Sequence, residues 1–435
     1  MTGRDSMAGQ DWRIGVAGLG TVGAGLLTFL ADRPGFAPAG GRAVVTGVSA
    51  RSRSRPRPFD ISGLPWFDDP VALATSPQID VFVELIGGSD GPAKAAVEAA
   101  LSAGKPVVTA NKALIAEHGA ELAALAESKG APLLFEAAVM GGVPAVKMVR
   151  EALVGDDIKS IAGILNGTCN YILTEMEATG RSFADVLGEA QRLGYAEADP
   201  TMDVGGFDAA HKISILAALA FGCAPNYAAA EIEGIEQVEL LDIQLARDLG
   251  YRIKLVASAD RSPDGVLVRV HPSLAPLAHP LAQAGGALNA LFIEGARVGR
   301  IFLQGPGAGA GPTAAAVAAD IADVMTGAVR PVFQAPAASL SPFTPVDPSK
   351  SVGRAFLRFL VKDEPGVIAA VSETLAEAGV SIESFLQKPV DNADGVPIVL
   401  TTHAVAESVL KAAIERIAGL PAVLDRPRLL RIARI

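Results

Sequence analysis

The stretch WRIGVAGLGTVGAGLLTFL, residues 12–30, decides the class of fold. It begins as a short apolar run over residues 12–19, passes through glycines and changes to a helical pattern over residues 20–31. The helical pattern is set by apolar residues at the spacing of one helix face, namely Val22, Leu26, Leu27 and Leu30. A strand that leads through glycines directly into a helix is typical of the first strand–helix–strand unit of an α/β domain.

The alternation of strands and helices continues well beyond this stretch. Strand-like runs occupy residues 42–50, 80–88 and 106–112, and the segment 91–105 reads as a helix. Such alternation indicates a parallel sheet with helical crossovers. We therefore predict an α/β fold that opens with a Rossmann-type dinucleotide-binding domain over residues 1–140.

The glycines of GLGTVG, residues 18–23, follow the pattern G-x-G-x-x-G at the turn between strand and helix. The first glycine permits the tight turn, the second lets the backbone approach a pyrophosphate, and the third lets helix and strand pack closely. A tight turn without a ligand is the alternative. Because of its context, we predict that the whole loop binds the cofactor, through Gly18, Leu19, Gly20, Thr21, Val22 and Gly23.

The end of the second predicted strand bears on which cofactor is bound. A site that prefers NAD usually has an acidic residue there, which holds the ribose hydroxyls. Here Ser49 and Ala50 are followed by Arg51, whose guanidinium can hold a 2′-phosphate through paired hydrogen bonds. We therefore predict NADP, with NAD as the alternative. The arginines that follow are interpreted as a solvated loop, namely Arg53, Arg55 and Arg57.

The composition excludes several classes of protein. The chain has 435 residues, a length that predicts about two to four domains. Its net charge of −10 argues against a partner that is nucleic acid or a membrane surface. Two cysteines, Cys169 and Cys223, are too few for a disulfide framework, and the polar N-terminus does not read as a signal peptide. We therefore expect a cytoplasmic protein.

The chain beyond residue 140 is less regular. Residues 141–330 mix helices, the clearest at 209–221, with strand candidates, which predicts a mixed α/β domain. The proline-rich segment 331–352 reads as a linker. Residues 353–435 then alternate strand, turn, helix and strand, as expected for a compact α+β domain.

Four further segments resemble one family. They are TANKAL at residues 109–114, FEAAVMGGVP at 135–144, ILNGTCNYIL at 164–173 and GYAEADPTMDVGGFDAAHK at 194–212. In this order and spacing, the chain resembles homoserine dehydrogenase over about residues 12–330. The segment KDEPGVIAAVSETLAEAGVSI resembles an ACT domain, a small amino-acid-sensing module. The resemblance implies that residues 141–330 serve catalysis and dimerisation, and that about 305–330 complete the dinucleotide-binding domain.

The resemblance implies reversible, nicotinamide-dependent reduction of L-aspartate 4-semialdehyde to L-homoserine, on the route to threonine and methionine. Charge develops on the aldehyde oxygen as hydride arrives, so the site needs a proton donor there. The resemblance assigns this role to Lys212, with Asp208 one turn earlier on the same helix face. It places Lys112 near the nicotinamide and the substrate hydroxyl, where two lysines should each lower the other's pKa.

The resemblance also supplies binding residues. Those predicted for the substrate are Glu197, Asp203, Asp208, Asn166, Gly167 and Thr168. Those predicted for the cofactor outside the glycine loop are Arg51, Lys112, Gly194 and Gly309. Asp199 is interpreted as a turn residue before Pro200, and Cys169 as a small buried residue, because hydride transfer needs no thiol.

The segment FEAAVMGGVP resembles a loop that binds a monovalent cation. Carried over by position, Na⁺ would be held by the carboxylate of Glu136 and by the carbonyl oxygens of Val139, Gly141 and Val143. The alternative is a glycine turn in which Glu136 accepts backbone hydrogen bonds. The sequence departs from the family at Met140, where a small residue is more usual and the larger side chain could crowd the loop.

The ACT-like domain implies regulation by an amino acid. Asp363, Gly366 and Val367 lie where the backbone of such modules meets a ligand between two paired copies. The place of the reaction in metabolism favours L-threonine, and the alternative is a module that only dimerises the enzyme or binds another ligand. A homodimer or homotetramer is expected.

Two other functions stay open at this point. Another ACT-bearing dehydrogenase, of the 2-hydroxyacid or prephenate type, would place a histidine at the site of hydride transfer. A non-catalytic, NADP-linked amino-acid sensor would lack the catalytic lysine. The presence of Lys112 and Lys212 argues against both.

Overall fold

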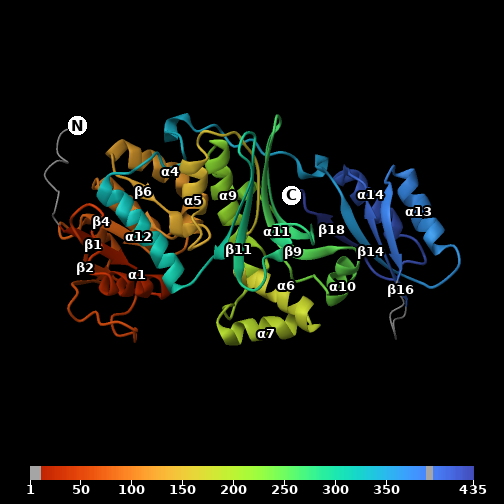
Figure 1. Ribbon diagram of the computed structural model, residues 1–435, viewed down its shortest axis with the longest axis horizontal. Coiled ribbons are helices and arrows are strands. Elements are labelled where there is room, and N and C mark those ends of the chain that lie inside the picture. Colours follow the sequence, from red (N-terminus) through yellow and green to blue (C-terminus); the bar gives the residue numbers. More distant parts are fainter. Residues whose placement is uncertain (1–10, 388–394) are drawn as a thin grey trace.

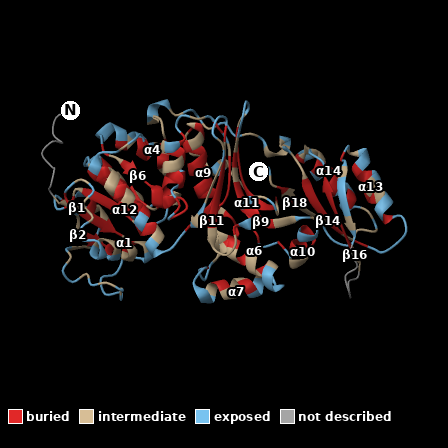
Figure 2. Cartoon of the chain, viewed as in Figure 1, coloured by how far each residue is buried: buried red, intermediate tan, exposed pale blue. Residues whose placement is uncertain are grey.

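The computed structural model describes residues 11–387 and 395–435. Figure 1 shows three parts along the long axis: an N-terminal sheet with its helices, a larger central part, and a C-terminal unit at the far end. Figure 2 shows that the buried residues line the sheets and the helix faces turned toward them. One large apolar cluster runs from the first part through the central part and takes in Phe356, Val399, Leu430 and Ile432 of the C-terminal unit, which also has a second cluster of its own.

The N-terminal part contains a six-stranded parallel sheet in the order β3-β2-β1-β4-β5-β6. The strands are β1 (Trp12–Ala17), β2 (Ala43–Ser49), β3 (Trp66–Phe67), β4 (Val81–Glu84), β5 (Val107–Thr109) and β6 (Leu133–Leu134). The strand order reverses between β1 and β4, and ligands of such folds bind beyond the carboxyl ends of the strands at this point. The predicted Rossmann-type fold is confirmed.

The helices of this part come from two distant stretches of the chain. Four of them connect the strands: α1 (Thr21–Asp32), α2 (Pro70–Thr75), α3 (Pro92–Ser102) and α4 (Lys112–Lys129). Helix α12 (Ala310–Thr326) returns from much later and packs beside α1 (Figure 1). This approach requires glycine, because a Cβ atom on Gly25 would lie 2.4 Å from the carbonyl oxygen of Ala310.

The central part has an antiparallel run of long strands. They are β7 (Ile158–Ile164), β9 (Tyr251–Ser262), β10 (Gly265–Pro276), β11 (Leu288–Gly295) and β12 (Gly299–Pro306), with the short β8 (Glu231–Ile232) beside β10. Its helices are α5 (Ala145–Lys147), α6 (Gly167–Thr179), α7 (Phe183–Leu193), α8 (Thr201–Val204), α9 (Phe207–Phe221), α10 (Leu240–Asp248) and α11 (Pro280–Gln283). Helix α9 packs on β9 and β10 and is buried almost throughout, because it is apolar on all faces beyond its first turns.

Short helical turns mark the connections. A π-helical turn, Met148–Ala152, follows α5, and 3₁₀ turns lie at Glu136–Ala138, Tyr227–Ala229, Ala337–Ser339 and Pro348–Lys350. The last two belong to the predicted linker, which does not run free. Its Phe333 is fully buried, and the N–H of Ala337 donates to the carboxylate of Glu127 on α4. The linker is held because its apolar residues have surface to bury.

The C-terminal unit is joined to the central sheet. Its elements are β13 (Val352–Gly353), β14 (Ala355–Val361), α13 (Val367–Glu377), β15 (Ile382–Gln387), β16 (Val396–Thr402), β17 (Val405–Ala406), α14 (Glu407–Ala418) and β18 (Arg428–Ile432). Strand β18 pairs antiparallel with β14 and parallel with β10, so a single ten-stranded sheet runs through both parts. The α+β domain is confirmed; the division of the chain at residues 140, 330 and 352 stays a prediction.

Within the described ranges, no helix combines the length and the apolar composition that crossing a bilayer requires.

Candidate active site

Helix α9 begins with the acid–lysine pair that the sequence places on one helix face. The Nζ of Lys212 lies 2.7 Å from Oδ2 of Asp208 and donates a second hydrogen bond to the carbonyl oxygen of Leu165 at 2.8 Å. Lys212 is 8% exposed and Asp208 is 4% exposed. The chain enters the helix through Gly206 with φ of 85°, where a Cβ atom would lie 3.1 Å from a side chain of β10. Glycine therefore lets the polar start of α9 enter the core.

Lys112 reaches the same carboxylate from the N-terminal part. It opens α4, whose N-cap residue Asn111 accepts a hydrogen bond from the backbone N–H of Leu114. The Nζ of Lys112 lies 2.6 Å from Oδ1 of Asp208. One carboxylate therefore holds two lysines and joins two parts of the molecule. The side chain of Lys112 is 40% exposed, so the site opens to solvent on the Lys112 side.

The two lysines differ in pKa. Burial lowers the pKa of Lys212, and Lys112 adds to this effect, while Asp208 opposes it. The charge of Asp208 raises the pKa of Lys112 in spite of burial. Lys112 thus lowers the pKa of Lys212 as expected, whereas the pKa of Lys112 itself is raised because its contact with Asp208 outweighs burial. Burial would raise the pKa of Asp208, but the two ammonium groups hold it well below its usual value.

Asn166 connects the predicted substrate-binding acids. Its Nδ2 donates to Oδ1 of Asp203 at 2.7 Å and to Oδ2 of Asp208 at 2.9 Å. Its Oδ1 caps α6 by accepting the backbone N–H of Cys169. Burial raises the pKa of Asp203. The structure thus brings Asn166, Asp203, Asp208 and both lysines together, as the resemblance implies.

Gly167 and Thr168 hold the segments around this site in place through contacts with backbone carbonyl oxygens. A Cβ atom on Gly167 would lie 2.7 Å from the carbonyl oxygen of Ala287, so glycine allows α6 to approach that loop. The hydroxyl of Thr168 donates to the carbonyl oxygen of Tyr195 at 2.7 Å. The proton of Thr168 is therefore used to hold the segment after α7 and is not free for a ligand.

Glu197 and Gly194 lie on that segment, at the rim. Gly194 ends α7 in the left-handed conformation with φ of 78°. Glu197 is exposed and forms no ion pair with another described residue, although its charge contributes to raising the pKa of Lys112. The structure therefore places Glu197 near the lysines without bringing it into contact with them.

The glycine loop has the geometry that a pyrophosphate requires. Gly18 has φ of 99°, and a Cβ atom there would lie 2.2 Å from the carbonyl oxygen of Leu85. A Cβ atom on Gly23 would lie 2.1 Å from the carbonyl oxygen of Gly18, whereas the space beside Gly20 is open. Gly20 is the N-cap of α1 and has no side chain to satisfy the first N–H groups, which suits a bound anion. These residues fit a dinucleotide.

Two more predicted cofactor contacts flank this loop. Arg51 follows β2 at the carboxyl edge of the sheet and is exposed, and its guanidinium has no partner within residues 11–387 and 395–435. Arg57, by contrast, donates to carbonyl oxygens of its own loop, including that of Ser52 at 2.5 Å. Gly309 has φ of 115° and is the N-cap of α12, which packs on α1.

The predicted cation loop is closed by Glu136. Its carboxylate accepts the backbone N–H groups of Val146 and Lys147 at 3.1 and 2.7 Å. Burial and the nearby Asp320 raise the pKa of Glu136 to about 7. Burial raises the pKa of Asp320 to about 6, and Lys147 is 3.6 Å from its Oδ1. The two buried carboxylates would suit a bound cation. The backbone hydrogen bonds that Glu136 accepts are those expected for the alternative, a glycine turn without a cation.

The carbonyl groups of this loop are not equivalent. That of Val143 accepts the N–H of Ala145 at 2.7 Å, whereas those of Val139 and Gly141 have no hydrogen-bond donor in the described part of the chain. Met140 has φ of 58° and is fully buried. It is accommodated by turning its side chain into the core.

Sequence reasoning did not find Lys254, which contacts α6. It is 1% exposed and donates to Oδ1 of Asn170 on α6 and to the carbonyl oxygen of Ala284, both at 2.7 Å. Burial lowers its pKa to about 8. The signal available in the sequence was a single lysine inside the apolar strand RIKLVASA. Cys169 is fully buried and its pKa is raised well above the usual value by burial, as suits a small core residue.

Three family models match the chain. They are described as "Homoserine dehydrogenase, NAD binding domain" for residues 18–136, "Homoserine dehydrogenase" for residues 144–322 and "ACT domain" for residues 355–422.

Relatives and solved structures agree with these matches. Homoserine dehydrogenase of Pseudomonas aeruginosa is 44% identical over 94% of this chain and 96% of its own, and that of Bacillus subtilis is 37% identical over 91% and 92%. The crystal structure of a homoserine dehydrogenase from Thiobacillus denitrificans has a TM-score of 0.91 at 40% identity, covering 98% of each chain. A hyperthermophilic archaeal homoserine dehydrogenase in complex with NADPH has a TM-score of 0.64 at 28% identity, covering 74% of this chain and 100% of its own.

Proposed function

This chain belongs to the homoserine dehydrogenase family, and on that premise we propose how its residues carry out the reaction. The activity is that of a nicotinamide-dependent oxidoreductase acting on a CH–OH group, which interconverts L-homoserine and L-aspartate 4-semialdehyde. The two other functions that the sequence left open, a different ACT-bearing dehydrogenase and a non-catalytic sensor, are set aside by this membership.

Lys212 is the group proposed to move the proton of the substrate hydroxyl. A nicotinamide held by the glycine loop would supply hydride chemistry at the adjoining carbon. In the direction of oxidation, the neutral amine of Lys212 takes the hydroxyl proton, and in the direction of reduction its ammonium returns it. The lowered pKa of Lys212 supports this role, because such a lysine is more often neutral near the working pH.

The carboxylates around Lys212 are proposed to hold the substrate. Asp208, Asp203 and Glu197 offer acceptors for its ammonium group and hydroxyl, with Asn166 orienting the first two. The pKa of Lys112 is raised, so Lys112 stays protonated and would stabilise negative charge on the substrate oxygen.

The observation that carries this proposal is the contact of Asp208 with both lysines. We expect Lys212→Met to lower kcat for homoserine oxidation about 10²–10⁴-fold, because the proton acceptor is lost. Binding of NADPH, measured by its fluorescence, should stay unchanged. The matched control is Lys129→Met, on the exposed end of α4, which should keep wild-type kcat. Full turnover in Lys212→Met would contradict the role of Lys212, although not the family.

The preferred cofactor is proposed to be NADP. The support is Arg51, an exposed guanidinium without a protein partner in the described ranges, at the carboxyl edge of the sheet beside the glycine loop.

We expect Arg51→Ala to lower the ratio of kcat/KM with NADP to kcat/KM with NAD about 10-fold or more, because a charge-assisted contact to the 2′-phosphate is lost. Arg55→Ala, in the same exposed loop, is the control and should leave the ratio unchanged. A wild-type enzyme that uses NAD with the higher kcat/KM would contradict the proposal.

Further family traits are proposed on narrower support. Sodium at Glu136 is supported by the excess of buried carboxylates there, and L-threonine as effector is supported by the ACT domain at residues 355–422. A homodimer or homotetramer and a cytoplasmic location are carried over as proposals of the same kind.

A further inference from the structure

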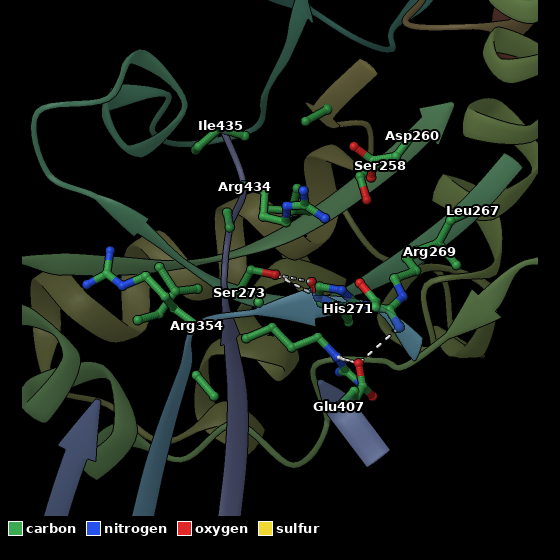
Figure 3. A pocket seen from close by; sticks show the side chains of 18 of the residues that line it. Ser258, Asp260, Leu267, Arg269, His271, Ser273, Arg354, Glu407, Arg434 and Ile435 are labelled. Atoms are coloured by element: carbon green, nitrogen blue, oxygen red, sulfur yellow. Dashed lines mark hydrogen bonds and ion pairs between the residues drawn. The ribbon is translucent and has the colours of Figure 1, made fainter. Parts of the chain in front are cut away.

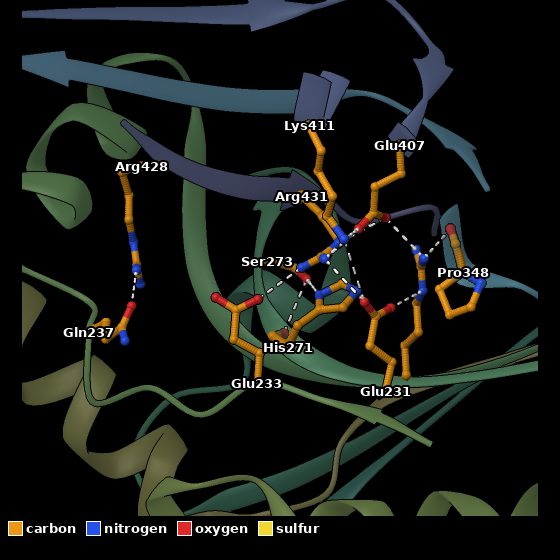
Figure 4. A network of polar contacts seen from close by, with 11 residues as sticks. Glu231, Glu233, Gln237, His271, Ser273, Pro348, Glu407, Lys411, Arg428 and Arg431 are labelled. Carbon is orange, nitrogen blue, oxygen red and sulfur yellow. Dashed lines mark hydrogen bonds and ion pairs between the residues drawn. The ribbon is translucent and has the colours of Figure 1, made fainter. Parts of the chain in front are cut away.

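A network of ion pairs joins the central part of the molecule to the C-terminal unit. Arg269 of β10 lies 2.9 Å from Glu231 of β8 and 2.9 Å from Glu407 at the start of α14. Arg431 of β18 lies 2.7 Å from Glu407 and 3.0 Å from Glu233. Figure 4 shows Glu231 and Glu233 of the central part converging with Glu407 and Arg431 of the C-terminal unit. Both arginines are therefore already paired with carboxylates.

A cavity of about 70 Å³ lies beside this network. Its walls come from β9 and β10, from the start of β14, from α14 and from the C-terminal tail at residues 433–435 (Figure 3). One water molecule needs only about 10–15 Å³ of such space. The cavity therefore has room for several waters or for a small polar molecule.

Two groups of opposite charge face this cavity without a protein partner. Asp260 of β9 and Arg434 of the tail both line it, and neither side chain forms a hydrogen bond or an ion pair within residues 11–387 and 395–435. Figure 3 shows Arg434 reaching toward the strand that carries Asp260 and Ser258. Burial raises the pKa of Asp260, and the charge of Arg434 acts against this rise, as expected for two side chains across a small cavity.

His271 adds a hydrogen-bond acceptor to the wall. Its Nδ1 lies 2.7 Å from Oγ of Ser273, whose hydroxyl is within 3.2 Å of the carbonyl oxygen of His271. The hydroxyl of Ser273 donates its single hydrogen bond to that carbonyl oxygen. Nδ1 must therefore carry the ring proton and donate to Oγ of Ser273, so Nε2 is a hydrogen-bond acceptor. Burial and the two neighbouring arginines lower the pKa of His271 well below its usual value, so the ring is neutral.

We propose that this cavity is a binding site for a small α-amino acid, separate from the active site and from the strand–turn–helix at the start of the ACT domain. Asp260 holds the ammonium group and Arg434 holds the carboxylate. The hydroxyl oxygen of Ser258 and Nε2 of His271 accept hydrogen bonds from a side-chain hydroxyl of the ligand or from a remaining N–H of its ammonium group. A zwitterion matches the wall because Asp260 and Arg434 offer charges of opposite sign, whereas Arg269 is already paired.

The test is calorimetric titration of the full chain with glycine, L-serine, L-threonine and L-alanine, each compared with its N-acetyl derivative. We expect saturable binding of at least one free amino acid and none of its N-acetyl derivative, which lacks the ammonium group. Asp260→Asn and Arg434→Ala should each weaken binding about tenfold or more. Arg434 is exposed on the tail, so its replacement does not threaten folding.

The control variant is Asp264→Asn, in the exposed turn between β9 and β10, which should bind the amino acid like the wild type. Asp363→Asn, in the turn before α13 of the ACT domain, reports on any separate site there. The proposal is overturned if none of the four amino acids binds at millimolar concentration. It is overturned equally if Asp260→Asn and Arg434→Ala bind with wild-type affinity, or if Asp363→Asn alone abolishes binding. Loss of turnover in Lys212→Met bears on the active site and leaves this test untouched.

Discussion

Asp208 holds two ammonium groups with one carboxylate, at 2.6 and 2.7 Å. On an exposed helix, the pair that it forms with Lys212 would contribute only about 0.3–0.5 kcal/mol. Both groups are buried, and removing one partner of a buried ion pair costs about 3–5 kcal/mol because the other charge stays behind. A zwitterionic substrate can share these contacts, which gives the buried charges a use beyond pairing with each other.

The pH dependence of the reaction follows from the same contacts. In the proposed mechanism, oxidation of homoserine needs neutral Lys212, so kcat/KM should rise with pH as Lys212 loses its proton. Asp208 raises the pKa of Lys212, so Asp208→Asn should move this rise to lower pH. It should also reduce the maximum of kcat/KM about 10²-fold, because Lys212 is no longer held in place. Profiles of kcat/KM against pH measure both effects.

The control for this prediction is Asp199→Asn. Asp199 is exposed and accepts hydrogen bonds from Thr201 in its own turn, so its replacement should leave the profile where it is. A profile of Asp208→Asn that rises at the wild-type pH would show that another group is the base.

At the scale of elements, α6 is fixed at its N-terminal end by two neighbouring asparagines. Asn166 at its N-terminus contacts the carboxylates of the site, and Asn170 one turn later accepts a hydrogen bond from Lys254. Asn170 in turn donates to the carbonyl oxygens of Ala284 and Leu288. A lysine buried among neutral acceptors is costly, and its pKa of about 8 reflects that cost. Through these contacts Lys254 holds α6 against the loop of residues 284–288.

Replacing this lysine should therefore affect substrate binding more than chemistry. We expect Lys254→Met to raise KM for homoserine about tenfold with a smaller change in kcat, because α6 loses one of its supports. Thermal unfolding should show a loss of about 1–3 kcal/mol, since Oδ1 of Asn170 loses its donor, while the carbonyl oxygen of Ala284 keeps the hydrogen bond from Asn170.

Lys159→Met, on the exposed face of the neighbouring β7, is the matched control and should change neither quantity. Equal losses in kcat and kcat/KM for Lys254→Met, with KM unchanged, would argue for a role in the reaction step instead.

At the scale of the whole molecule, strand β18 connects the C-terminal unit to the central part, because it pairs with both β14 and β10. The backbone pairing with β10 is short, covering Ser273 with Arg431 and Leu274 with Ile432. Apolar residues of β14, β16 and β18 pack into the core of the central part, and the buried ion pairs around Glu407 add polar contacts to this junction. Burial acts to raise the pKa of Glu407, but hydrogen bonds and the charges around it lower the pKa to about 2.

This shift predicts how the junction responds to acid. Because the pKa of Glu407 is lower in the folded protein, its contribution is present at neutral pH and lost as pH falls from about 4.5 toward 2. We expect Glu407→Gln to lower the free energy of unfolding at pH 7 by about 2 kcal/mol. Below pH 4.5 the difference from the wild type should shrink. Urea unfolding at several pH values measures this.

Glu415→Gln, farther along the same helix and largely exposed, should be neutral at every pH. A difference between Glu407→Gln and the wild type that stays constant down to pH 2 would show that the charge of Glu407 is not what stabilises the junction.

The sequence by itself determined the elements whose pattern is local. The apolar run of residues 12–19, the glycines of residues 18–23 and the helix that follows could be predicted because each depends on neighbours a few residues away. The same holds for Asp208 and Lys212, which share a face of α9 through their spacing of four residues. The resemblance to a family then supplied Lys112, Asn166 and Asp203, which no local pattern connects with them.

Only the tertiary structure decided how distant segments meet. The contact of Lys112 with Asp208, the support of α6 by Lys254 and the pairing of β18 with β10 each join stretches that lie far apart in the sequence. It also decided the opposite pKa shifts of the two lysines, because burial and the shared carboxylate depend on the packed environment. The physical reason is that periodicity records which face of an element is apolar, whereas its neighbour across that face is chosen by packing of the whole chain.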